Sequence, residues 1–233
     1  MAKVVVFGVG QWAELAHFYL THDSTHEVVA FTVDRDYLTS SEYKGLPVVP
    51  YDEIEQNYPP REFHLFIPIS FEKMNHLRAE KYNDAKRRGY ELISYVSSKA
   101  TTFPGFECGD NCFILEDNTI QPFARIGNDV VMWSGNHVGH HSTIRDHVFL
   151  GRAVISGGCL IESFSFVSGN AVIRDDVVVA HDTLVGMATY IARDTREFEI
   201  YRNPGTEPAR ARSDRIRRLA QRKSVKSRND LTD

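Results

Sequence analysis

An aliphatic side chain returns almost every sixth residue between Ile114 and Ile191, and this repeat constrains the fold more than any other feature of the sequence. Neither the helical period of about 3.6 residues nor the strand period of about two residues produces it. A triangular coil does, because each flat side takes about six residues and turns one aliphatic side chain toward a shared axis. The predicted axial residues, with one five-residue step after Leu150, are Ile114, Ile120, Ile126, Met132, Val138, Ile144, Leu150, Ile155, Ile161, Val167, Ile173, Val179, Val185 and Ile191.

Small or polar residues between the axial positions predict the corners of the coil. They include Gly127-Asn128, Gly157-Gly158, Ser168-Gly169-Asn170 and Arg174-Asp175-Asp176. An ordinary run of short antiparallel strands is the alternative, and its turn signals would come about 8 to 12 residues apart. The shorter and more regular spacing favours the coil.

The first hundred residues have a different pattern, in which strand and helix alternate. We expect strands over residues 3–7, 26–33, 46–49, 63–69 and 91–96, helices over 11–21 and 74–88, and a helical turn near 52–58. Right-handed crossovers between such strands predict a small parallel sheet with helices on both faces. The predicted organisation is therefore an α/β domain over residues 1–98, an all-β coil over 99–195 and a C-terminal extension over 196–233.

Composition is typical of a water-soluble protein, with 42% hydrophobic and 25% charged residues among 233. No apolar stretch approaches the roughly 20 residues that span a bilayer, and the start lacks a signal-peptide cleavage site, so we expect no membrane insertion and a cytoplasmic protein. Cys108, Cys112 and Cys159 form no C-x-x-C pair. We therefore expect free thiols in a reducing compartment.

The last part of the chain is basic. Residues 201–233 carry ten Lys and Arg against four acidic residues, within a chain of net charge −4. A basic tail can bind nucleic acid or anionic lipid. Because this one has only a short apolar stripe (Ile216, Leu219, Ala220) and no interleaved aromatic residues, we expect a solvated terminal helix and no nucleic-acid partner.

A glycine turn between the first strand and the first helix indicates a ligand site. Backbone amides at a helix start can meet an anion, and Gly8 and Gly10, followed by Gln11, permit close approach. Asp34, with Asp36, ends the second strand, where an acid can accept hydrogen bonds from a ribose or a base. The pattern predicts a nucleotide-bearing ligand, and a tight turn that binds nothing is the alternative.

Three histidines within five residues mark the coil: His137, His140 and His141. They could supply a base near neutral pH or hold a metal ion. A metal is disfavoured because the three fall on different sides of a corner and no Asp, Glu or Cys follows before Asp146. Surface histidines without a catalytic role are the remaining alternative.

Both halves of the chain resemble the hexapeptide-repeat sugar acyltransferases that carry an N-terminal Rossmann-like domain. That group includes sialic acid O-acetyltransferases and bacterial N-acetyltransferases acting on UDP- or GDP-linked amino sugars. The resemblance extends to Gly205-Thr206-Glu207-Pro208-Ala209-Arg210, which is similar to the family's closing Gly-x-x-Pro-Ala-Lys/Arg. It implies a left-handed parallel β-helix and a homotrimer. It also implies acetyl-CoA or another acyl-CoA between neighbouring coils, a nucleotide-linked sugar on the N-terminal domain and no metal.

The family pattern also implies roles for particular residues. Its base lies four residues before an axial aliphatic residue, which gives His140 before Ile144. A backbone amide one coil further on, here that of Gly157, would meet the oxyanion. The implied contacts to the acyl donor are Gly157, Gly158, Ser168, Gly169 and Asn170, and those to the nucleotide sugar are Gly8, Gly10, Gln11, Asp34 and Asp36.

Three departures from the family pattern bear on specificity. His141 follows the base where an acid is usual, so His137 or His141 stays an alternative base. Phe149 stands where many members have a second histidine near the thioester, and we expect it beside the acyl donor. The five-residue step also shortens this coil. The prediction is an acyl-CoA-dependent acyltransferase for cell-surface glycan, with N- or O-acylation and the acyl group open.

Two other functions are compatible with the same pattern. One is a non-catalytic trimeric protein that binds a nucleotide sugar without CoA. The other is a β-helical carbonic anhydrase with zinc held by His137, His140 or His141. The first predicts nucleotide-sugar binding alone, and the second predicts stoichiometric metal in the purified protein.

Overall fold

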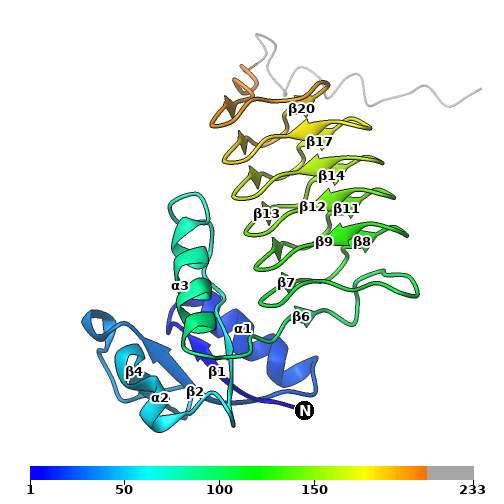
Figure 1. The fold of residues 1–233 in the computed structure, drawn as a ribbon. Coiled ribbons are helices and arrows are strands. Elements are labelled where there is room, and N and C mark those ends of the chain that lie inside the picture. Colours follow the sequence, from blue (N-terminus) through cyan, green and yellow to red (C-terminus); the bar gives the residue numbers. More distant parts are fainter. Residues whose placement is uncertain (209–233) are drawn as a thin grey trace, which may run out of the picture. The chain divides into compact units, whose positions relative to one another are not determined.

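The computed structural model describes residues 1–208, which form an N-terminal α/β domain and a triangular β-helix (Figure 1). The N-terminal sheet has the order β3-β4-β2-β1-β5, and every pairing is parallel except that of β3 with β4. Its strands are β1 (Lys3–Phe7), β2 (Glu27–Val33), β3 (Glu42–Tyr43), β4 (Leu46–Pro50) and β5 (His64–Phe66). The helices are α1 (Gln11–His22), α2 (Ile54–Asn57), α3 (His76–Arg87) and the 3-10 turns η1 (Arg35–Tyr37) and η2 (Tyr51–Glu53).

Both faces of this sheet are covered, as predicted. Side chains alternate along a strand, so Val4 and Val6 of β1 join one core cluster, together with α1. Val5 and Phe7 join the other, together with Tyr82 of α3. The predicted α/β layer arrangement is confirmed.

The β-helix consists of two-residue parallel strands, and the second residue of nearly every strand points to the axis. All fourteen predicted axial residues lie in one buried cluster, each at most 6% exposed. The strands are β6 (Tyr95–Val96), β7 (Phe113–Ile114), β8 (Thr119–Ile120), β9 (Arg125–Ile126), β10 (Val131–Met132), β11 (His137–Val138), β12 (Thr143–Ile144), β13 (Phe149–Leu150), β14 (Val154–Ile155), β15 (Leu160–Ile161), β16 (Phe166–Val167), β17 (Val172–Ile173), β18 (Val178–Val179), β19 (Leu184–Val185), β20 (Tyr190–Ile191) and β21 (Ile200–Tyr201).

Three parallel sheets form the sides of the triangle. The first face holds β6, β7, β10, β13, β16, β19 and β21; the second holds β8, β11, β14, β17 and β20; the third holds β9, β12, β15 and β18. The first corner joins the first and second faces and includes residues 151–153 and 168–171. The second corner joins the second and third faces and includes residues 121–124, 139–142, 156–159 and 174–177.

The five-residue step after Leu150 is absorbed entirely within one corner. Arg152 takes a left-handed backbone (φ 68°) in that shortened turn, as residues three before the axial position do elsewhere. The strand ladder continues on both sides, because Val138 pairs with Ile155 and Ile144 with Ile161. The short step therefore changes the shape of a corner and leaves the axial core intact.

Two strand predictions in the N-terminal half need correction. The strand expected over residues 63–69 is paired only over β5, His64–Phe66. The strand expected over 91–96 does not complete the N-terminal sheet. Leu92 forms a single bridge with Leu65, after which β6 pairs with β7 and opens the β-helix. The hydrogen bonds of Tyr95 go to the first full coil, which sequence periodicity did not reveal.

The N-terminal domain is fixed onto the first face of the β-helix. Phe113, Val131 and Phe149, which point outward from that face, share a core cluster with β1 and α1. Arg78 of α3 is fully buried and donates hydrogen bonds to the backbone carbonyls of Asp129 and His147. Its guanidinium also lies 3.2 Å from the Asp129 carboxylate. Buried contacts of this kind hold the two halves in one arrangement.

The end of the described chain adds a final strand, β21, which pairs with β19. The expected terminal helix, the basic stretch beyond residue 208 and the closing Ala209-Arg210 lie outside the described residues. Within residues 1–208, the structure has no helix that is both long and apolar enough to cross a membrane.

Candidate active site

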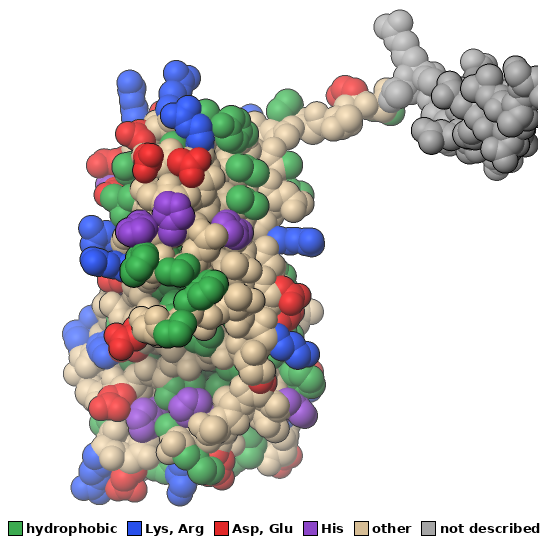
Figure 2. Space-filling view, turned by 90° about the vertical axis from the view of Figure 1, so that its right-hand side faces the viewer, with side chains coloured by type: hydrophobic (Ala, Val, Ile, Leu, Met, Phe, Trp, Pro, Cys, Tyr) green, Lys and Arg blue, Asp and Glu red, His purple; other side chains and the backbone are tan. Residues whose placement is uncertain are grey.

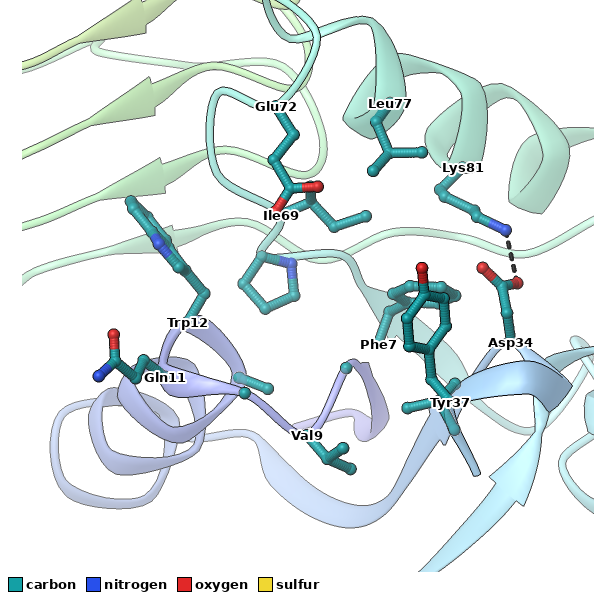
Figure 3. Close-up of a pocket in the computed structure, with 15 residues that line it drawn as sticks. Phe7, Val9, Gln11, Trp12, Asp34, Tyr37, Ile69, Glu72, Leu77 and Lys81 are labelled. Carbon is teal, nitrogen blue, oxygen red and sulfur yellow. Dashed lines mark hydrogen bonds and ion pairs between the residues drawn. The ribbon is translucent and has the colours of Figure 1, made fainter. Parts of the chain in front are cut away.

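A cavity of about 470 Å³ opens at the carboxyl ends of β1 and β2 (Figure 3). Gly8, Gly10, Gln11 and Asp34 line it, which brings four of the five predicted nucleotide-binding residues together. The fifth, Asp36, lies in the exposed η1 turn and is not part of the lining. The carboxyl end of a parallel sheet is where α/β folds bind ligands.

The glycine turn leaves backbone donors available to this cavity. Gly8 has a left-handed backbone (φ 103°), and its N–H donates to the Thr32 carbonyl at 2.7 Å. Gly10 is the N-cap of α1, and no side chain caps that helix end. The first N–H groups of α1 therefore lack intrahelical partners, and the helix dipole favours an anionic group there.

Asp34 is paired with a residue that the sequence did not single out. Lys81 Nζ lies 2.5 Å from Asp34 Oδ1, and the pair faces the cavity beside Tyr37 (Figure 3). Lys81 is only 15% exposed and lies over the Phe7 ring. The four-residue spacing of Leu77 and Lys81 on α3, which places both on one helix face, was the available signal. The pair offers one donor and one acceptor to a polar ligand.

His140 and His141 lie together in the second corner. The Nδ1 atoms of the two rings are 3.1 Å apart, so one donates and the other accepts according to the tautomer. A Cβ added to Gly157 would lie 2.7 Å from His140 Cε1 and 2.8 Å from Nε2. His140 thus covers the backbone of Gly157, and only glycine leaves room for the ring in this position. The structure thus places His140 beside Gly157, as the family pattern implies.

His137 has a different environment from the other two histidines. It points outward from β11 on the second face, between Thr119 and Val154 of the neighbouring strands. Neither residue gives its imidazole a hydrogen-bond partner of the kind that His141 gives His140. His140 and His137 therefore differ in the hydrogen bonding of their rings.

The backbone amide of Gly157 already has a partner. Its N–H donates to Asp175 Oδ1 at 3.1 Å, and Asp175 lies one coil further along the second corner. The same column continues where the Gly158 N–H donates to the His140 carbonyl at 2.9 Å. Asp175 was not among the predicted site residues, although its offset of three six-residue steps from Gly157 indicates that the two residues stack.

Ser168, Gly169 and Asn170 do not flank His140 within one chain. They form the first corner, between β16 and β17, where the Asn170 N–H donates to the Arg152 carbonyl. Each six-residue step moves the chain to the next side of the triangle, so a corner recurs only after three steps. In a single chain these residues therefore lie at a different corner from His140, and their contact with the acyl donor stays a prediction.

Phe149 packs between the two halves of the chain, and its expected place beside the acyl donor stays a prediction. It is 5% exposed on the first face, and its ring packs against Trp12, Phe71 and Phe166 with centroids 5.9, 5.4 and 5.2 Å away. Within one chain Phe149 is part of the core between the N-terminal domain and the β-helix, so it does not lie beside His140.

The corner histidines belong to no metal-binding group among the described residues. Within residues 1–208, no group of three His, Cys, Asp or Glu side chains is arranged to hold a metal ion. The zinc alternative therefore lacks a ligand set in the described part of the chain.

Comparison with known proteins identifies the fold. No protein-family model matches the chain. The acetyltransferase domain of PglB from Neisseria gonorrhoeae is 20% identical with a TM-score of 0.74, over 86% of this chain and 96% of that one. A perosamine N-acetyltransferase from Caulobacter crescentus, solved with CoA and GDP-perosamine, is 22% identical with a TM-score of 0.74, over 86% of this chain and 93% of that one. At the level of the fold, a left-handed parallel β-helix behind an α/β domain, the predicted resemblance is confirmed.

One curated relative matches part of the sequence. An acyl-[acyl-carrier-protein]–UDP-N-acetylglucosamine O-acyltransferase from Paracoccus denitrificans is 28% identical over 81 residues. That stretch is 34% of this chain and 31% of the relative's length.

Proposed function

We propose that the protein is an acyltransferase that moves an acyl group from acyl-CoA to an amino or hydroxyl group of a nucleotide-linked sugar, for cell-surface glycan. The packing of His140 against Gly157 carries this proposal, because it joins a base to a backbone amide at an exposed corner. The cavity at the glycine turn supports a nucleotide-bearing acceptor. The similar solved structures, one with CoA and GDP-perosamine and one with acetyl coenzyme A, support both ligand classes.

In the proposed reaction His140 is the general base. With the shared proton on His140 Nδ1 and the His141 ring accepting it, Nε2 carries a free lone pair. The acceptor nitrogen or oxygen attacks the thioester carbonyl carbon and passes its proton to Nε2. The carbon–sulfur bond then breaks, and the thiolate takes that proton. General-base catalysis of this kind contributes roughly 10²- to 10⁴-fold to the rate.

The tetrahedral intermediate requires a donor for its oxyanion, and we assign this role to the Gly157 amide. Asp175 occupies that donor in the free chain. Because Asp175 is exposed, its side chain can turn away when a thioester enters. One oxyanion donor contributes about 10²- to 10³-fold to kcat. The alternative function is a protein that binds a nucleotide sugar without CoA. The hydrogen bond that occupies the Gly157 amide is the observation that favours it.

We further propose a homotrimer in which sites are shared between copies. The nucleotide cavity belongs to the domain that covers the first face, whereas His140 lies at the second corner, between the other two faces. A neighbouring copy can bring its own cavity to His140. Mixed trimers of His140→Ala and Lys81→Met chains should then regain activity that neither variant has alone. The three free thiols support a reducing, cytoplasmic location.

A mass-spectrometric screen tests the activity directly. The protein is incubated with acetyl-CoA and a panel of UDP-, GDP- and dTDP-linked amino and neutral sugars, with His140→Ala as the matched variant. We expect one acylated product, formed at least a hundredfold more slowly by the variant. Full turnover by His140→Ala would refute the mechanism. Calorimetric binding of a nucleotide sugar without any binding of CoA would favour the non-catalytic alternative.

A further inference from the structure

A second cavity, of about 250 Å³, lies at the second corner one coil before His140. Two loops line it, residues 103–106 and residues 120–124. The lining is apolar apart from Gln121, and it includes the rings of Phe103, Phe106 and Phe123. Nothing in the proposed reaction with acetyl-CoA uses this space.

The cavity adjoins the two histidines of the corner. The Phe123 ring centroid lies 4.8 Å from that of His141, and Gln121 Oε1 accepts a hydrogen bond from the His140 N–H at 2.9 Å. Figure 2 shows histidine side chains gathered directly beside a hydrophobic patch on this side of the β-helix. A chain that extends from the reacting carbonyl carbon in this direction therefore contacts an apolar surface.

The two sides of His140 differ in polarity. Toward the next coil the corner holds Gly157 and the exposed charged residues Arg174, Asp175 and Asp176. Toward the previous coil it holds the phenylalanine-lined cavity. An acyl thioester has the same asymmetry, with polar amides along the pantetheine arm and an apolar chain beyond the carbonyl. Burial of the apolar end in the apolar cavity is the favourable orientation.

We propose that this cavity binds the acyl chain of the donor, and that the donor is a thioester with a chain of about four to eight carbons. The inference rests on the proposed acyltransferase function and goes beyond it. A volume of 250 Å³ holds roughly eight groups the size of a water molecule, far more than an acetyl methyl requires. Phe103 is 42% and Phe123 73% exposed in the free chain, and an acyl chain would cover both.

Calorimetric titration with CoA, acetyl-CoA, butyryl-CoA and hexanoyl-CoA tests the proposal on the full chain. Each methylene that leaves water for the cavity is expected to tighten binding by about fourfold. The dissociation constant should fall at each step of the series, by tenfold or more from acetyl-CoA to hexanoyl-CoA. Equal affinity for acetyl-CoA and hexanoyl-CoA would overturn the proposal and leave the acyltransferase function standing. Absence of binding by every thioester, and by CoA, would overturn both.

A matched pair of variants locates the effect. Phe123 and Phe198 both occupy left-handed corner positions (φ 69° and 63°) and are 73% and 67% exposed, but only Phe123 lines the cavity. Phe123→Ala should reduce the preference for hexanoyl-CoA over acetyl-CoA at least fivefold, and Phe198→Ala should not change it. Ala124→Phe, which fills the cavity, should abolish the preference while CoA binding persists. A change of oligomeric state by light scattering without a change of preference would identify the cavity as a contact between copies and refute the proposal.

Discussion

Replacement of Arg78 by methionine should weaken the attachment between the two halves of the protein. The Arg78 side chain is fully buried and bonds to backbone carbonyls of both halves, those of Ser70 at 2.8 Å and of Asp129 at 3.1 Å among them. Burial lowers the pKa of Arg78, and the adjacent Asp129 carboxylate opposes that shift. Methionine fills much of the volume but removes the guanidinium beside the Asp129 carboxylate, itself 0% exposed, which keeps its hydrogen bonds with Asn111 and His147.

The size of the effect follows from the loss of the ion pair between Arg78 and Asp129. Removal of one partner of a buried ion pair costs about 3 to 5 kcal/mol, a large share of the roughly 5 to 15 kcal/mol that stabilises a typical domain. The double variant Arg78→Met/Asp129→Asn leaves no buried charge unpaired. We expect it to be more stable than the sum of the two single variants predicts, by at least about 1 kcal/mol.

Urea denaturation followed by tryptophan fluorescence measures this loss of stability at the junction of the two halves. The two tryptophans of the chain, Trp12 on α1 and Trp133 on the β-helix, have ring centroids 5.3 Å apart across the junction of the two halves. Their emission should therefore change when the halves separate. An unfolding free energy of Arg78→Met within about 1 kcal/mol of the wild-type value would refute the reasoning. Strict additivity of the two single changes in the double variant would refute it as well.

Three further outcomes follow from the corners of the β-helix. His140→Ala should lower kcat by roughly 10²- to 10⁴-fold with the CoA dissociation constant unchanged, while His137→Ala keeps most of the activity; the reverse order in steady-state kinetics would reassign the base. Gly139→Ala should destabilise the protein by about 1 to 3 kcal/mol in thermal unfolding, because the new Cβ would lie 2.5 Å from backbone of the next coil, and an unchanged Tm would contradict this close approach. The hydrogen bond to Asp182 raises the pKa of His181, so its stabilisation is present below about pH 6.5 and is lost as the pH rises through the raised pKa. The gap in urea midpoint between wild type and His181→Gln should accordingly be wider at about pH 5.5 than at about pH 9, and a gap independent of pH would show that the ion pair is not its source.

Local sequence pattern predicted the β-helix well because each coil repeats one requirement. One aliphatic residue must face the axis and one corner residue must tolerate a left-handed backbone. The family resemblance placed His140 and Gly157 one coil apart, and the structure brings them into contact. The strand–turn–helix pattern placed Gly8, Gly10 and Asp34 at one sheet edge, where they line a cavity. In each case the candidate residues lie at a fixed offset from a regular element of secondary structure.

Outward-facing residues could not be interpreted in the same way. The six-residue period indicates that Phe149 points away from the axis. It does not indicate whether solvent, a ligand or another domain covers this side chain. The N-terminal domain covers it, through contacts with Trp12 and Phe71 that have no sequence proximity. Likewise no sequence pattern shows that Lys81 of α3 pairs with Asp34, because only the fold brings the two residues together.

The sequence by itself therefore determined the coil and its axial core, because these depend on spacing within a repeat. The family resemblance added the expectation that His140 and Gly157 lie one coil apart. Only the tertiary structure decided which face the N-terminal domain covers and that Arg78 joins the two halves. These arrangements depend on contacts between segments distant in the chain. Their energies come from burial and charge pairing, which no local period encodes.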